Sequence, residues 1–261
     1  MQRFSTLYII GFSTAVCVVC SLLVSSSAVG LRSLQQQNIA LDRQKNVLIA
    51  AGLVGEGEKL TAARVKELFE QVQSVVVDLR TGQETDIDPQ TFDQAQAAKD
   101  PTASSSAPKN AAGVSRLPHH ATVYKVLKDG RLDEVILPIE GKGLWSTCYG
   151  FLALDADGTT IRGITFYQHG ETPGLGGEID NPRWKSLWIN RKAFDETWTP
   201  RIEVIKGHAG PAAEEPHKVD GLSGATITSR GVSHLVQFWL GEQGFGPYLQ
   251  RLRDNGGPGH G

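Results

Sequence analysis

The stretch ATVYKVLKDGRLDEVIL, residues 121–137, decides the fold of the second half of the chain. Ala121 to Lys128 alternates as a strand does, and Asp129-Gly130 is typical of two-residue hairpin turns. Val135 to Leu137 then continues as the returning strand. The pattern therefore predicts an antiparallel hairpin at the centre of this region.

Further hairpins are predicted on both sides of this stretch. Downstream, Tyr149 to Leu154 and Ile161 to Tyr167 form a strand pair around an Asp157-Gly158 turn. Upstream, SVVVDLRTGQ at residues 74–83 predicts a strand that runs into a Thr81-Gly82 turn. Helices are expected at 33–52 (ending at Gly52), after Thr61, from Asn181-Pro182, after Thr228, and from Pro247 to Arg253. Hairpins mixed with helices favour an α+β domain over a doubly wound sheet.

The N-terminal segment predicts a membrane anchor. No charged residue occurs between Arg3 and Arg32, and Leu7 to Val24 reads LYIIGFSTAVCVVCSLLV, long enough to cross a bilayer as a helix. A cleaved signal peptide is the alternative, since Ser26-Ser27-Ala28 offers small residues at a cleavage site. An uncleaved anchor is preferred because the apolar core exceeds the roughly 7–15 residues of a signal peptide. Positive charges flank both sides, so charge counting leaves the orientation open.

Composition excludes several classes of function. The 261 residues include 26 Lys and Arg against 28 Asp and Glu, so a net charge of −2 provides no basic face for nucleic acid. Three cysteines are too few for a disulfide framework, and no zinc-type spacing of Cys and His occurs. Cys17 and Cys20 share one face of the anchor, either as packing residues or as a thiol pair near a redox centre of a partner. Cys148 is expected to be a buried free thiol.

Three glycine-containing segments are candidates for a binding site. DGLSGATIT, residues 220–228, precedes a predicted helix, whose N-terminus favours a phosphate. A plain glycine loop with a Ser/Thr cap is the structural alternative. A serine-hydrolase elbow is disfavoured by Ala225 at its last position and by polar residues before it. GKGLW at 141–145 and HGETPGLGG at 169–177 are the other two segments, and neither is a dinucleotide fingerprint.

Together these segments resemble the FMN-binding domain family. Within the first segment, DGLSGAT at residues 220–226 resembles the flavinylation motif of that family, in which a dedicated transferase moves FMN from FAD to the hydroxyl of the motif's last Thr, here Thr226. The anchor and the following LRSLQQQNIALDRQKNVLIAAGL narrow the resemblance to the C-subunit family of bacterial Na⁺-translocating NADH:quinone reductases. Rnf-type complexes contain a homologous subunit with the same motif.

The resemblance implies a set of site residues. Thr226 would carry FMN as a phosphoester, and Asp220 would help the flavin transferase recognise the motif. The other implied cofactor-binding residues are Ser223, Gly224, Ala225, Thr228, Leu144, Trp145, Glu171, Thr172, Leu175 and Gly176. No catalytic residue of the chain itself and no metal ligand are expected.

The resemblance also implies a function, partners and a location. The chain is expected to relay electrons within a NADH:ubiquinone reductase, among subunits A, B, D, E and F, as a single-pass protein of the bacterial inner membrane with its domain in the periplasm. An Rnf-type subunit and a membrane-anchored flavin sensor or assembly module are the alternatives. The expected divisions are an anchor at 1–32, helices and strands with a flexible linker at 33–118, the FMN-binding domain at 119–254 and a flexible tail at 255–261. Within the second division, residues 94–116, rich in Ala, Ser, Pro and Lys, predict a mobile surface excursion.

Overall fold

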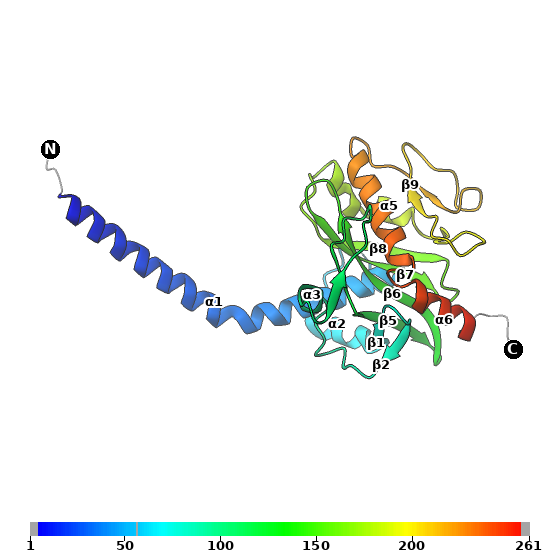
Figure 1. Cartoon of the computed structure of the whole chain (residues 1–261), viewed down its shortest axis with the longest axis horizontal. Coiled ribbons are helices and arrows are strands. Elements are labelled where there is room, and N and C mark those ends of the chain that lie inside the picture. The colour runs from blue at the N-terminus through cyan, green and yellow to red at the C-terminus, as the bar shows by residue number, and fades with distance from the viewer. Residues whose placement is uncertain (1–4, 56, 257–261) are drawn as a thin grey trace. The chain divides into compact units, whose positions relative to one another are not determined.

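The computed structural model describes residues 5–55 and 57–256 (Figure 1). Arg3 and the end of the expected tail, 257–261, lie outside the described residues. The chain divides into two compact units between Arg43 and Gln44. Most of helix α1, Thr6–Ala50, forms the first unit, and the apolar side chains of that part are exposed. The helix is long and apolar enough to cross a membrane. Cys17 and Cys20 are exposed on this helix.

The second unit is built on one six-stranded sheet in which every neighbouring pair is antiparallel. The strand order is β2-β1-β5-β6-β7-β8. The strands are β1 Val72–Asp78, β2 Gln83–Thr85, β5 His120–Lys128, β6 Arg131–Lys142, β7 Thr147–Asp155 and β8 Ile161–Gln168. The predicted α+β class with antiparallel hairpins is confirmed.

The hairpin turns form where the sequence predicts them. Asp129 and Gly130 both have positive φ, 52° and 76°, as a turn of type I′ requires. Gly82 and Gly158 have φ of 67° and 66° in the turns that follow β1 and β7. These positions need glycine, or a residue such as Asp, because other side chains rarely adopt this conformation.

Helices cover both faces of the sheet (Figure 1). On one face, α5 (Thr226–Leu240) packs so closely that a Cβ at Gly141 would stand 2.4 Å from Cβ of Leu235. On the opposite face, a Cβ at Gly163 would stand 2.3 Å from the carbonyl oxygen of Ala50, at the end of α1. Helix α2 (Ala62–Phe69) lies on that second face, where Phe69 contacts Tyr124 of β5 edge to face. Each face therefore has its own apolar core.

The remaining elements are short. They are α3 Gln94–Lys99, β3 Ser104–Ser106, β4 Arg116–Pro118, η1 Gly176–Asp180, α4 Pro182–Ser186, β9 Glu203–Val204, β10 Lys218–Val219 and α6 Gly246–Gly256. The excursion predicted over 94–116 is corrected, because α3 and the β3–β4 pair occupy it. The guanidinium of Arg116 donates to the hydroxyl and the carbonyl of Ser104, at 2.8–3.1 Å, and composition does not reveal such a pairing between distant residues.

The start of one helix and the pairing of two strands add detail to the expected organisation of the chain. Helix α5 begins at Thr226, before the position expected from Thr228, so both threonines lie in its first turn. Strands β1 and β2, which belong to the expected 33–118 division, pair into the same sheet as the strands after residue 118. The predicted caps at Thr61 and Asn181 do accept hydrogen bonds, from the amides of Arg64 and Arg183.

Candidate functional site

The three glycine-containing loops meet at one carboxylate, that of Glu171. Its Oε1 accepts from the amides of Trp145 and Ser146, at 2.9 and 3.3 Å. Its Oε2 accepts from the amide of Leu144 at 3.1 Å and from the hydroxyl of Thr228 at 2.5 Å. The 169–177 loop thus joins the GKGLW loop to the first turn of α5.

The close approach of these loops depends on three glycines. A Cβ at Gly143 would stand 2.6 Å from Oε1 of Glu171, and one at Gly176 would stand 2.5 Å from Oγ1 of Thr228. A Cβ at Gly231, inside α5, would stand 2.4 Å from the carbonyl oxygen of Lys142. Sequence reasoning selected Gly176 but missed Gly143 and Gly231. A glycine inside a predicted helix indicates close packing at that position, because glycine lowers helix stability and a larger residue would otherwise be favoured.

Glu171 is buried and ionised. Burial acts to raise its pKa, but the hydrogen bonds from Thr228 and the three loop amides outweigh burial and hold the pKa of Glu171 below its usual value. Burial, together with the charges of Glu171 and Asp180, raises the pKa of Cys148 to about 12. Cys148 is therefore a buried, protonated thiol, as predicted.

Thr226 is the first residue of α5, and its side chain is exposed. The residue before it, Ala225, provides no side-chain cap. The amides at the start of a helix lack internal partners and carry the positive end of its dipole. The first turn of α5 therefore fits a phosphate group esterified to Thr226. Ser223 and Gly224 beside it are exposed, and Gly224 has a φ of 70° with Leu175 in contact.

Large apolar side chains remain exposed on the same three loops. Trp145 is 70% exposed and Ile227 is 57% exposed, and Leu144 and Leu175 are also exposed. Thr172 shapes the loop of Leu175, since its carbonyl accepts from the amides of Leu175 and Gly177. Apolar side chains of this kind fit the face of a flat, hydrophobic ring system such as a flavin. Ile227 is an addition that the sequence-based residue set lacked.

Asp220 has structural partners in the loop before the motif. Its carboxylate accepts from the amide of Ala209 at 2.9 Å and lies 2.7 Å from Nδ1 of His208. Burial acts to raise the pKa of Asp220, and the hydrogen bonds from His208 and Ala209 more than offset it, so the pKa is lowered. Its carbonyl accepts from Nε1 of Trp184 at 2.8 Å. The role of Asp220 in recognition by a transferase stays a prediction.

Arg191 holds the loop before the motif through hydrogen bonds to Gly210 and Glu215, and sequence reasoning missed it. It is buried, and its guanidinium donates to the carbonyls of Leu187, Gly210 and Glu215 at 2.7–3.1 Å. Only a contact between distant segments reveals this role, since an isolated Arg carries no motif.

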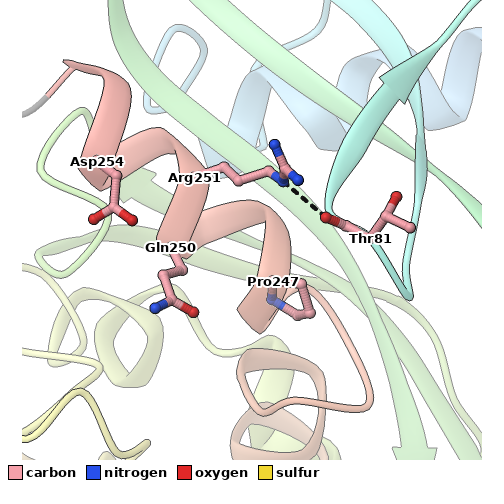
Figure 2. Close-up of a pocket in the computed structure, with 5 residues that line it drawn as sticks. All are labelled: Thr81, Pro247, Gln250, Arg251 and Asp254. Atoms are coloured by element: carbon pink, nitrogen blue, oxygen red, sulfur yellow. Dashed lines mark hydrogen bonds between the residues drawn. The ribbon is translucent and has the colours of Figure 1, made fainter.

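A shallow cavity of about 370 Å³ lies elsewhere, between the β1–β2 turn and α6 (Figure 2). It is lined by Thr81, Pro247, Gln250, Arg251 and Asp254, and Arg251 donates to the carbonyl of Thr81 at 2.8 Å. No residue of the three motif loops lines it. Within residues 5–55 and 57–256, no group of three or more His, Cys, Asp or Glu side chains is arranged to hold a metal ion.

Comparison with known proteins agrees with this geometry. Residues 143–241 match the family model of the FMN-binding domain. The chain is 46% identical over 242 residues to the C subunit of the Na(+)-translocating NADH-quinone reductase of Yersinia pestis, covering 91% of this chain and 90% of that protein. It is 47% identical over 243 residues to the corresponding C subunit of Pseudomonas aeruginosa, with 91% and 92% covered.

Two solved structures are also similar. The crystal structure of Shewanella oneidensis NqrC matches with a TM-score of 0.74 at 36% identity, over 82% of this chain and 97% of that one. The crystal structure of the C subunit of the same kind of reductase from Parabacteroides distasonis matches with a TM-score of 0.65 at 27% identity, over 84% and 96%.

Proposed function

The chain belongs to the NqrC family, the C subunits of Na(+)-translocating NADH-quinone reductases, and from this premise we propose that it carries FMN covalently on Thr226 and relays electrons between partner subunits. Family membership makes it an electron-transfer flavoprotein subunit with an FMN-binding domain. The phosphoester linkage and the place of this FMN in the electron path are the proposed parts.

One observation carries the choice of Thr226. Of the two threonines in the first turn of α5, Thr226 is exposed, whereas Thr228 is 1% exposed and donates its hydroxyl to Glu171. No hydrogen bond to the Thr226 hydroxyl occurs within the described residues, and no base adjoins it to activate it. The attachment chemistry is therefore supplied by a separate flavin transferase.

The residues of this chain bind and orient the cofactor. The first-turn amides of α5 bind the phosphate, and Gly224 and Ala225 leave room for the ribityl chain. Leu144, Trp145, Leu175 and Thr172 offer an exposed surface to the ring, and the buried Gly176 lets their loops close on α5. FMN supplies the electron chemistry when bound, and the burial and hydrogen bonding around it tune its potential.

The partners are the other subunits of the complex, namely A, B, D, E and F. By resemblance, an FMN held by Thr226 would take electrons that come from NADH through a partner's flavin and iron centres, and would pass them to a flavin in the B subunit. Partners also bind NADH, since the chain has no dinucleotide fingerprint. They provide the Na⁺ path, because one helix without charged residues from Ser5 to Leu31 cannot form one.

The Rnf-type alternative and the sensor or assembly module predict different behaviour in membranes. In native membranes, NADH is expected to reduce the FMN on Thr226 only when the other reductase subunits are present. Reduction that does not depend on those subunits would favour a role outside this complex.

The proposed location is the inner membrane, with the α1 anchor retained and the domain in the periplasm. Lys128, exposed at the β5–β6 turn, offers a labelling position as Lys128→Cys. A membrane-impermeant maleimide is expected to label this variant in spheroplasts without lysis. Labelling only after lysis would place the domain in the cytoplasm, and a mature protein beginning near Ala28 would show a cleaved signal peptide.

The deciding experiment for covalent attachment is the intact mass of the denatured full chain from its native host. We expect an increment of one FMN less one water, lost in Thr226→Ala and retained in Ser223→Ala, the neighbouring exposed hydroxyl. An unmodified wild-type mass in a host that flavinylates other proteins would refute covalent attachment.

A further inference from the structure

The carboxylate of Glu171 has no acceptor capacity left for a ligand. Each of its oxygens accepts two hydrogen bonds, from Trp145 and Ser146 on Oε1 and from Leu144 and Thr228 on Oε2. A carboxylate oxygen provides about two lone-pair sites, so four donors saturate the group. Glu171 therefore acts on a flavin through the residues that it holds, and not by touching it.

Two of those residues present the ring surface. Leu144 and Trp145 project exposed side chains while their backbone amides are fixed on Glu171. Charge-assisted hydrogen bonds of this kind, in a buried position, are stronger than neutral ones and hold geometry well. The carboxylate of Glu171 thus ties the ring surface to the first turn of α5 through Thr228.

The fourth donor, Thr228, is one of two threonines in the first turn of α5. Transfer of FMN from FAD to a threonine breaks its Oγ–H bond and the pyrophosphate P–O bond, forms an Oγ–P bond, and releases AMP and a proton. At Thr228 this would remove the one proton that it donates to Glu171. It would also place a phosphodiester anion against an ionised carboxylate in a buried site, which is strongly unfavourable.

We infer that Glu171 is the positioning residue of the flavin site: it fixes the GKGLW loop beneath the ring and reserves Thr226, rather than Thr228, for FMN. This inference rests on the proposed function and adds to it the reason that only one of the two threonines in the first turn of α5 is an attachment point. Closure of the loop over Thr228 supports it, since a Cβ at Gly176 would stand 2.5 Å from Oγ1 of Thr228.

The test uses the full chain, coexpressed with a flavin transferase and purified in detergent. Peptide mass spectrometry locates the flavin, and redox titration gives its midpoint potential. In Thr226→Ala we expect no flavin on Thr228. In Glu171→Gln we expect flavin on Thr226 with a shifted midpoint potential and visible spectrum. Glu171→Asp, which keeps the charge, should return both values toward those of the wild type.

Thr228→Val provides a second variant that removes one donor and preserves shape, should Glu171→Gln fail to fold. We expect a smaller shift of the potential in the same direction, with full flavin on Thr226. Flavin on Thr228 in Thr226→Ala would overturn the selection, and wild-type potentials in both Glu171→Gln and Thr228→Val would overturn the positioning role. A wild-type chain without flavin on Thr226 would instead refute the proposed function itself.

Discussion

The backbone of Gly231 in α5 lies directly against the carbonyl oxygen of Lys142, where a Cβ would stand only 2.4 Å from that oxygen. Lys142 belongs to the GKGLW loop, and Gly231 follows the first turn of α5, which contains Thr226. This contact brings the expected attachment point and the expected ring surface to a fixed separation. The separation depends on the absence of one methyl group.

Gly231→Ala is therefore expected to destabilise the chain. Alanine favours a helix over glycine by about 1 kcal/mol, but an overpacked backbone contact costs about 1–3 kcal/mol. We expect a lower free energy of unfolding in urea and an altered FMN spectrum. Gly210→Ala is the control, since its Cβ would meet Glu215 at an ordinary 3.5 Å. Equal or higher stability of Gly231→Ala would show that α5 can move away without cost.

The hairpins could be predicted from the sequence because their signals are local. Asp129, Gly130 and Gly82 adopt positive φ within a few residues of the strands that their turns join. The three site segments were found in the same way, as short runs of glycine near a strand or helix end. Local chemistry was sufficient for the fold class, whereas Thr226 was selected through the resemblance to the FMN-binding domain family.

The roles of individual site residues could not be predicted, because they depend on contacts between distant segments. Glu171 was expected to bind the cofactor, but its partners Trp145 and Thr228 come from 26 and 57 positions away. Gly231 and Arg191 contact the backbone of other loops; a glycine inside a helix indicates close packing, but nothing near either residue in the sequence identifies its partner. Periodicity and motifs carry no information on such pairs.

His169 contacts the backbone of Glu171, and the contributions of its two ring nitrogens to stability can be tested separately. Nδ1 accepts from the amide of Glu171 at 3.1 Å, and Nε2 lies 2.7 Å from the exposed carboxylate of Asp180. His169→Asn can keep an acceptor near Nδ1, whereas His169→Gln reaches Asp180 and leaves the buried amide unpaired. An unpaired buried amide costs about 1–3 kcal/mol, and a hydrogen bond to an exposed carboxylate such as that of Asp180 contributes less.

We therefore expect His169→Gln to lose more stability than His169→Asn, by about 1 kcal/mol or more in the free energy of unfolding. Chemical denaturation of the two variants in the same detergent measures the difference. The reverse order would mean that the bond to Asp180 dominates.

Asp220 has both a structural role and an expected role in recognition, and two variants separate them. Asp220→Asn keeps an acceptor for the amide of Ala209 but removes the charge. His208→Ala removes only an almost fully exposed partner. If the transferase recognises the motif through a hydrogen bond to the charged carboxylate of Asp220, loss of that charge in Asp220→Asn should slow flavin attachment about tenfold.

The unfolding midpoint of Asp220→Asn should remain near that of the wild type, and His208→Ala should be fully flavinylated. The fraction of chains with the FMN mass increment, followed over time, measures the rate. Normal flavinylation of Asp220→Asn would assign Asp220 to the structure of the loop alone.

Glu134, in β6, makes stability depend on pH. It is buried, and its Oε2 has no hydrogen-bond partner among the described residues. The nearest cation is Arg162, whose Nε lies 3.9 Å away and is closer to Asp155, at 2.9 Å. Burial raises the pKa of Glu134 to about 7, against the attraction of Arg162 and with added repulsion from Asp133 and Asp155.

A carboxyl whose pKa rises from 4.5 when unfolded to about 7 when folded favours the fold while it is protonated. That stability is fully present below pH 4.5 and is lost as the pH rises through 7. At about 1.4 kcal/mol per pKa unit, the loss reaches about 3 kcal/mol. The lowered pKa values of Glu171 and Asp220 act in the opposite direction, so the wild-type profile alone does not isolate Glu134.

The contributions of those other groups cancel when the free energy of unfolding of the wild type is subtracted from that of Glu134→Gln at each pH. We expect the variant to gain free energy of unfolding relative to the wild type as the pH rises from 5 to 8, by about 1–3 kcal/mol. Glu67→Gln is the control, because Glu67 is exposed on α2 and pairs with Arg64 on the surface. Its difference from the wild type should stay flat over the same range. A flat profile for Glu134→Gln as well would mean that Arg162 moves in to neutralise the buried carboxylate.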